Sequence, residues 1–230
     1  MAVRPFILNT LSSNNGANRP SPGKIKRSVL SSEDDGFIST LKNVYRQKLR
    51  PECEILDLMS SWVSHLPEEV KYKRVIGHGL SAQELARNPR LDYFFIKDLN
   101  IDQKLELGSE SLDAVLCTVS VQYMQEPEKV FAEIFRVLKA GGVVIVSFSN
   151  RMFYEKAIAA WREGSAYSRT QLVVQYFQAV EGFTEPQVTK IIPTRESELS
   201  NLKWIQKVLA LFSHSDPFYS VIAYKNFRPT

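Results

Sequence analysis

Short apolar segments and longer amphipathic segments alternate along most of the chain. Strand-like patterns occupy residues 54–58, 74–77, 93–97, 112–119, 143–148, 188–192 and 218–224. Helix-like spacing or helix-capping residues occupy residues 35–49, 81–88, 127–139, 153–162 and 168–180. This alternation predicts an α/β domain whose doubly wound, mainly parallel sheet of seven strands is covered by helices on both faces.

The turn after the first strand is the most informative stretch. In a doubly wound sheet, ligands bind at the carboxyl ends of the strands, where the strand order reverses. The segment "EILDLMSSWVSH", residues 54–65, ends an apolar strand at that place with an acid, Asp57. We therefore expect the ligand site around this turn.

Composition narrows the function only slightly. The chain has 230 residues, is 44% hydrophobic and 23% charged, and carries a net charge of +4 with its basic residues scattered among acids. We expect neither nucleic acid nor membrane as a partner. The two cysteines form no CxxC pair and the three histidines are far apart, which argues against a metal site. A buried, reduced Cys117 fits an intracellular compartment.

Residues 1–32 contain no acid and are rich in serine, asparagine and basic residues. This composition predicts a flexible N-terminal tail before one domain, residues 33–230. Cytoplasmic localisation follows if the tail is retained. The alternative is a plastid or other organelle, with the tail as a transit peptide.

The second half of the chain carries a family resemblance. "SLDAVLCTVSVQYMQEPEKVFAEI" followed by "RVLKAGGVVIVSFSN", residues 111–134 and 136–150, resembles class I S-adenosylmethionine-dependent methyltransferases of the small single-domain type. Ala140 replaces the proline that is usual there, and "FIKDLNIDQKLEL", residues 95–107, resembles the family's acid-containing loop. Over residues 35–225 the resemblance implies a Rossmann-like methyltransferase fold with an antiparallel C-terminal strand, and S-adenosyl-L-methionine as cofactor.

The departures from the family pattern concentrate in the cofactor half. Asp57 matches the acid of the family's D-x-G-x-G-x-G loop, but Met59, Ser61 and Val63 stand where the three glycines belong. Gly79 stands where the family has an acid for the ribose hydroxyls, whereas Asp98 keeps the acid beside the adenine. Val63 resists positive φ because it is β-branched, so we expect the loop to take another path.

Two outcomes remain open for this loop. Met59 and Trp62 plug the pocket, or Ser60, Ser61 and Ser64 supply hydroxyls and amides to the methionyl carboxylate, aided by the dipole of a following helix. The polar and aromatic residues at the crevice favour the second outcome. The missing ribose acid removes a charged hydrogen bond worth roughly 1.5–3 kcal/mol, a loss that an otherwise intact pocket survives.

The resemblance implies a set of site residues. Those facing the cofactor are Asp57, Leu58, Met59, Ser60, Ser61, Gly79, Leu80, Asp98, Leu99, Cys117 and Thr118. His65 is a candidate general base, although a helix-capping role is the alternative. Tyr123 follows the fourth predicted strand and either borders the acceptor or packs in the core.

The leading hypothesis is a methyltransferase that acts on a small-molecule acceptor. The alternative is a non-catalytic protein that keeps the fold for binding or assembly, as the lost glycines and ribose acid suggest. An insertion at residues 194–216 has an apolar helical stripe, which predicts a helix covering the sheet or, alternatively, a lid or partner surface.

Overall fold

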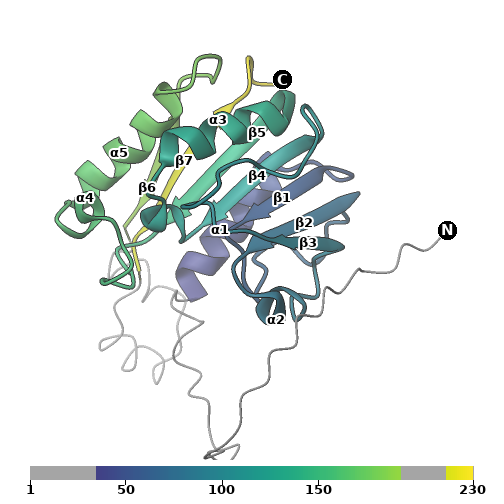
Figure 1. The fold of residues 1–230 in the computed structure, drawn as a ribbon, viewed down its shortest axis with the longest axis horizontal. Coiled ribbons are helices and arrows are strands. Elements are labelled where there is room, and N and C mark those ends of the chain that lie inside the picture. The colour runs from purple at the N-terminus through teal and green to yellow at the C-terminus, as the bar shows by residue number, and fades with distance from the viewer. Residues whose placement is uncertain (1–34, 193–215, 230) are drawn as a thin grey trace, which may run out of the picture. The chain divides into compact units, whose positions relative to one another are not determined.

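The computed structural model describes residues 35–192 and 216–229. One seven-stranded sheet runs through this part, in the order β3-β2-β1-β4-β5-β7-β6 (Figure 1). The strands are β1 (Glu54–Leu58), β2 (Arg74–Gly79), β3 (Tyr93–Ile96), β4 (Leu112–Thr118), β5 (Leu138–Phe148), β6 (Gln187–Ile191) and β7 (Phe218–Tyr224). The predicted N-terminal tail, and the insertion apart from Asp216, lie outside the described residues.

Strand directions confirm the predicted doubly wound sheet. The pairs β1–β2, β2–β3, β1–β4 and β4–β5 are parallel. β7 is antiparallel to both β5 and β6, so the predicted antiparallel C-terminal strand is also present. The chain winds outward from β1 in one direction and from β4 in the other, so the switch point lies between the carboxyl ends of β1 and β4.

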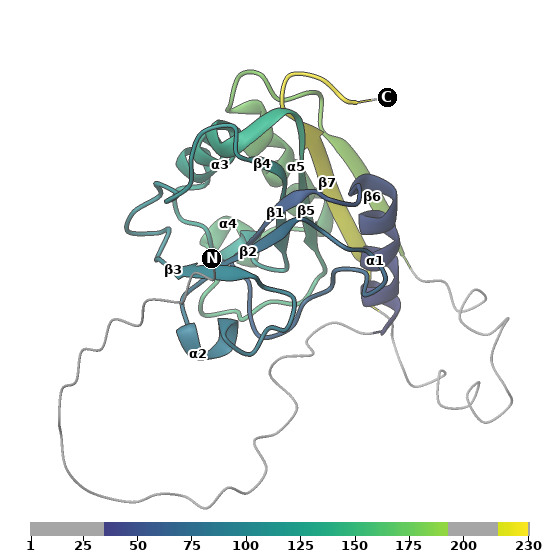
Figure 2. The ribbon, with the colours of Figure 1, turned by 90° about the vertical axis from the view of Figure 1, so that its right-hand side faces the viewer.

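Helices cover both faces of the sheet, which Figure 2 shows nearly edge-on. The helices are α1 (Asp35–Lys48), α2 (Ala82–Leu85), the 3₁₀ turn η1 (Val121–Tyr123), α3 (Pro127–Val137), α4 (Ala159–Arg162) and α5 (Ala166–Gln178). One face packs Phe37, Leu41 and Tyr45 of α1 against the sheet. The other packs the apolar sides of α3 and α5 against it, around Phe131 and Phe177.

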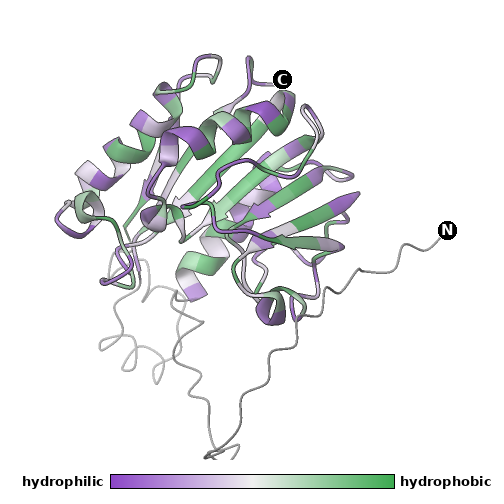
Figure 3. Ribbon diagram, in the orientation of Figure 1, coloured by the Kyte–Doolittle hydropathy of each residue, from purple (hydrophilic) through white to green (hydrophobic). Residues whose placement is uncertain are grey.

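Burial follows the apolar pattern of the sequence. The central strands are the most hydrophobic part of the ribbon in Figure 3, and every residue of β7 is buried. β5 is buried from Gly141 onward. Because both faces of these strands are covered, they lack the alternation of a half-exposed sheet. Within the described residues, no helix is both long and apolar enough to cross a membrane.

Three local predictions were wrong. The segment 153–162 is helical only at Ala159–Arg162. The pair Gly141–Gly142 lies inside β5 instead of between helix and strand, because α3 already ends at Val137. The crossover from β1 to β2 contains no helix at all. This last difference changes the site, since a helix start had been expected directly after the first loop.

Candidate functional site at the switch point

The carboxyl ends of four neighbouring strands bring most of the predicted site residues to one edge of the sheet. Asp57 lies near the end of β1, Gly79 ends β2, Asp98 follows β3, and Thr118 ends β4. The loops after these strands are joined by hydrogen bonds, so they form one connected surface. The sequence pattern therefore predicted correctly that these residues share one edge, and ligand binding at this edge stays a prediction.

His78 on β2 holds the first loop in place. The Ser60 amide donates to the His78 carbonyl at 2.7 Å, and the Met59 amide donates to His78 Nδ1 at 3.2 Å. His78 Nε2 lies 2.9 Å from the carbonyl of Lys97, so this nitrogen carries the proton and Nδ1 accepts. Burial lowers the pKa of His78, which keeps the ring neutral and suited to both bonds.

The absence of a side chain at Gly79 has a steric cause. A Cβ atom at this position would lie 2.8 Å from the carbonyl oxygen of Ser60. The space of a β2-terminal acid is thus taken by the backbone of the first loop. The path of the first loop therefore leaves no room for an acidic side chain at position 79, where the family has its ribose acid.

The loop beyond Ser60 is built from local turns. Asn88 Nδ2 donates to the Ser61 carbonyl at 2.9 Å. The hydroxyls of Ser61 and Ser64 accept from the amides of Val63 and Leu66 at 3.4 and 3.3 Å. Because no helix follows, the expected contribution of a helix dipole to anion binding is wrong for this loop.

Met59 and Trp62, the two residues that could plug the pocket, have different surroundings, and whether the pocket is open stays a prediction. Met59 packs against the hydrophobic core, whereas the Trp62 side chain is 41% exposed. Met59 takes a left-handed backbone with φ of 56°, while Val63 has no positive φ. The backbone at Val63 thus avoids positive φ, as its β-branched side chain predicted.

Asp57 is the acidic group beside the turn. Its Oδ2 accepts from the Ser60 hydroxyl at 2.6 Å. Burial raises its pKa to about 6, and the Ser60 hydrogen bond opposes this shift. At neutral pH the carboxyl is largely ionised and can meet a cation at the switch point.

A second strained turn lies beside the first. Val119 follows β4 with φ of 51°, an unusual conformation for a β-branched residue. The Ser120 hydroxyl donates to the Thr118 carbonyl at 2.8 Å and lies 3.2 Å from the Met59 carbonyl. Left-handed non-glycine residues cost about 1–3 kcal/mol each and persist where the surroundings hold them. Ser120 joins the two strained turns across the switch point.

The predicted floor of the site is buried and partly committed to structure. Thr118 Oγ1 lies 2.7 Å from the hydroxyl of Tyr45 on α1. Cys117 is buried, and burial raises the pKa of its thiol to about 12, so the thiol stays protonated. Leu58 is fully buried, whereas Leu80 is 69% exposed at the rim.

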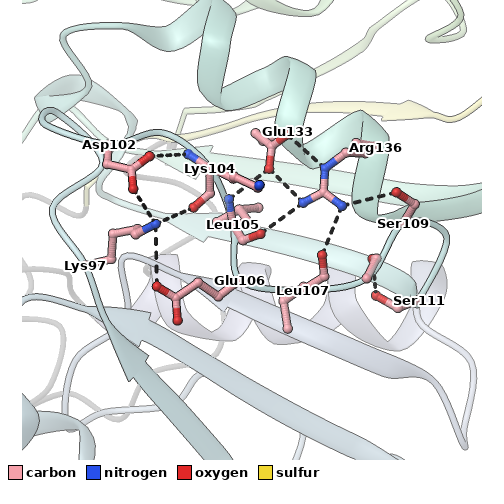
Figure 4. A network of polar contacts seen from close by, with 11 residues as sticks. Lys97, Asp102, Lys104, Leu105, Glu106, Leu107, Ser109, Ser111, Glu133 and Arg136 are labelled. Atoms are coloured by element: carbon pink, nitrogen blue, oxygen red, sulfur yellow. Dashed lines mark hydrogen bonds and ion pairs between the residues drawn. The ribbon is translucent and has the colours of Figure 1, made fainter.

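The loop after β3 carries the predicted adenine contacts, and hydrogen bonds from α3 anchor the far part of this loop. Asp98 Oδ1 accepts from the Asn100 amide at 2.9 Å, and Leu99 is buried. Farther along, Arg136 of α3 donates to the carbonyls of Leu105 and Leu107, both at 2.9 Å, and pairs with Glu133 (Figure 4). This network fixes the loop that presents Asp98.

The two catalytic candidates differ in their settings. His65 lies in the β1–β2 loop, where burial and then the charge of Lys42 lower its pKa. Tyr123 lies in η1, and its hydroxyl accepts from the Phe153 amide at 2.9 Å. Its ring lies 6.4 Å from that of Phe153. Tyr123 thus braces the loop after β5, and its catalytic role stays a prediction.

Comparison with known proteins gives the fold a name. A family model described as a methyltransferase domain matches residues 61–146. A search of curated proteins found no match. The cyclase SpnF has a similar structure, with 16% identity over 82% of this chain and 81% of that one and a TM-score of 0.58.

Two further structures are similar. A complex of the Haloferax volcanii Trm112 methyltransferase activator with a protein described as a methyltransferase gives a TM-score of 0.55, with 16% identity over 84% of this chain and 91% of the other. Haemonchus contortus phosphoethanolamine N-methyltransferase 2, in complex with S-adenosyl-L-methionine, gives 0.54, with 16% identity over 82% of this chain and 52% of that one. The described part of the chain therefore has the class I methyltransferase-like fold.

Sequence reasoning missed three residues that shape the candidate site. His78, Asn88 and Ser120 tie the first loop to β2, to the segment after α2, and to the end of β4. A polar residue inside the apolar run of β2 was the available signal for His78. Among the described residues, no group of three or more His, Cys, Asp or Glu side chains is arranged to hold a metal ion.

Proposed function

We propose that the protein is a methyltransferase that uses S-adenosyl-L-methionine to methylate a small-molecule acceptor. The observation that carries the proposal is the pair of strained turns at Met59 and Val119, which Ser120 joins at the switch point beside Asp57. Strain of this kind gathers at functional sites, and ligands of doubly wound sheets bind at this edge.

The residues present fit the two ends of the cofactor better than its middle. The ionised Asp57 suits the ammonium of the methionyl end, beside the backbone of Leu58, Met59, Ser60 and Ser61. Asp98 uses only Oδ1 in the contacts of the described residues, so its second oxygen can accept from the adenine amine beside Leu99. Gly79 and Leu80 border the ribose without a carboxylate, which lowers affinity by roughly one to two orders of magnitude.

The chemistry asks little of the protein beyond orientation. When bound, the cofactor supplies a methyl group on a sulfonium, which an O or N nucleophile displaces in line. The chain has to hold the acceptor in that line and exclude water, with Cys117 and Thr118 as the floor. The lowered pKa of His65 keeps its imidazole neutral at pH 7, so it can accept the acceptor's proton.

A second function is favoured by one specific feature. The first loop is fastened by two hydrogen bonds to His78 and by the contact between the Ser60 carbonyl and Gly79. A loop held permanently in this way suits a non-catalytic protein that uses the fold for binding or assembly. The similarity to SpnF, which is described as a cyclase, agrees with the rule that fold does not fix activity.

Titration calorimetry with S-adenosylhomocysteine separates the two functions. The enzyme hypothesis predicts binding, and a thermal stabilisation of about 2.7 kcal/mol at a ligand concentration one hundred times the dissociation constant.

Asp98→Asn should weaken binding roughly tenfold or more, because it removes a charged acceptor. The control Asp102→Asn changes an exposed carboxylate of the same loop, which contacts Lys97 and Lys104, and should bind normally. If calorimetry detects no binding of S-adenosylhomocysteine at millimolar concentration, the result favours the non-catalytic function.

A further inference from the structure

A cavity lies at the edge of the sheet opposite the switch point. It has a volume of about 230 Å³ and is lined by the end of α1, the starts of β4 and β5, and the segment after β7. Asp113, near the start of β4, borders this cavity, whereas Thr118 at the other end of the strand borders the switch point. Five residue steps along the strand separate them by about 16 Å. The cavity is therefore a separate place in the fold.

Three cations face this cavity: Lys48, Arg50 and Arg228. Within the described part of the chain, none of the three forms an ion pair with a carboxylate. Arg228 lies over the Tyr224 ring, 6.0 Å from its centroid. Burial, and then the charge of Arg228, lower the pKa of Lys48, as expected for cations that share one space.

The acids at this edge are already engaged. Asp113 is the acid that borders the cavity, and both of its carboxylate oxygens accept from Lys139 Nζ, at 3.0 and 3.1 Å. Its Oδ2 also accepts from the Glu54 amide at 2.8 Å. The Glu54 carboxylate is ion-paired with Lys73, Arg74 and Lys139. Neither acid is left to neutralise the three cations.

We propose that this cavity is a second binding site, separate from the switch point, for an anion that carries a phosphate group. Three cations leave an excess of charge that a monovalent carboxylate would balance only in part, whereas a phosphate dianion balances most of it. The two guanidinium groups supply planar donor pairs that match phosphate oxygens. The volume lies below the range of about 300–1,000 Å³ usual for drug-sized ligands, so the phosphate bears few further atoms.

Binding would connect segments that are distant in sequence. Lys48 and Arg50 belong to the end of α1 and the turn after it, whereas Arg228 follows β7. A bound phosphate replaces the repulsion between these cations with attraction, and so stabilises the folded state by mass action. This proposal does not depend on methyl transfer, because it concerns the amino ends of the parallel strands.

Thermal melts and calorimetry with inorganic phosphate, pyrophosphate and glycerol 3-phosphate test the proposal, with sodium chloride at equal ionic strength as the baseline. We expect saturable binding and a higher melting temperature than chloride gives. The double variant Lys48→Met/Arg228→Gln should bind roughly tenfold more weakly or worse. Without ligand it should melt close to the parent, since the relief of repulsion between the two cations offsets the loss of the contact between Arg228 and the Tyr224 ring, and a cooperative melt shows that it folds.

The matched control is Lys71→Met/Arg87→Gln, which removes the same charge from exposed positions that do not line the cavity. It should bind like the parent. Vesicles containing phosphatidic acid distinguish the source of the phosphate: sedimentation that needs Lys48 and Arg228, with weak binding of the soluble anions, identifies a lipid headgroup. Equal affinity of parent and cavity variant, or equal loss in the control, would overturn the site and leave only general charge attraction.

Discussion

The contact between the first loop and β2 can be tested by placing one methyl group at Gly79. In Gly79→Ala the new Cβ would lie 2.8 Å from the Ser60 carbonyl oxygen, where an ordinary contact is 3.4 Å or longer. The backbone itself tolerates alanine, because Gly79 is not among the glycines with positive φ. The loop must therefore move by roughly half an ångström, since a backbone atom cannot rotate away as a side chain does.

The cost can be bounded from the structure. Overpacking in a well-packed region costs about 1–3 kcal/mol. The displacement also strains the 2.7 Å hydrogen bond from the Ser60 amide to His78, worth about 1 kcal/mol. Gly→Ala exchange at a compatible site gains about 0.4–1 kcal/mol through the unfolded state. Gly108→Ala isolates that gain, because the nearest atom there lies 3.9 Å from the new Cβ.

Urea unfolding and thermal melts of both variants measure the difference. Gly79→Ala should be about 1–3 kcal/mol less stable than Gly108→Ala, which corresponds to roughly 2–12 °C in melting temperature for a domain of this size. Equal stability of the two variants would refute the reasoning. The loop would then yield easily from β2, and the argument for a permanently fastened loop would fail with it.

Three further predictions concern the same edge of the sheet. Burial raises the pKa of Asp57 from 3.8 in a model compound to about 6 in the folded state, so the protonated carboxyl stabilises the fold in acid and this stabilisation is lost as pH rises through 6. In urea unfolding, the stability of Asp57→Asn should therefore match that of the parent at pH 4 and exceed it by at most about 3 kcal/mol at pH 7.5. A difference in stability that does not change with pH would contradict the shift. Ser120→Ala should cost about 0.5–1.5 kcal/mol in the same assay by separating the two strained turns, while Ser111→Ala, which loses an exposed hydroxyl bond to Gly108, should cost less; equal costs would deny the link. Arg136→Lys should increase hydrogen exchange of the amides in the β3–β4 loop, because lysine cannot reproduce the guanidinium bonds to Leu105 and Leu107, and unchanged exchange would show that the network does not hold the loop.

Most of the architecture was readable from the sequence because it depends on local patterns. Continuous apolar runs such as the one in β4 mark strands covered on both faces, and their alternation with amphipathic helices fixes a parallel order. The helix start at Ser81 was also predictable, because serine followed three residues later by Glu84 is a capping pattern, and in the structure the Ser81 side chain accepts from the Glu84 amide. The helix it begins is only four residues long, because its length depends on packing partners that the cap does not specify.

One part of the candidate site could be predicted from the sequence, and the other part depends on the tertiary structure. The sequence by itself determined that Asp57, Gly79, Asp98 and Thr118 meet at one edge, since the ends of parallel strands must do so. It also showed that a loop with Val63 cannot follow a glycine path. Only the tertiary structure decided that the loop packs its Ser60 carbonyl against Gly79 and uses His78 as its anchor. Those contacts join residues 18 to 19 positions apart in sequence, through hydrogen bonds and steric fit that exist only once β1 and β2 have paired.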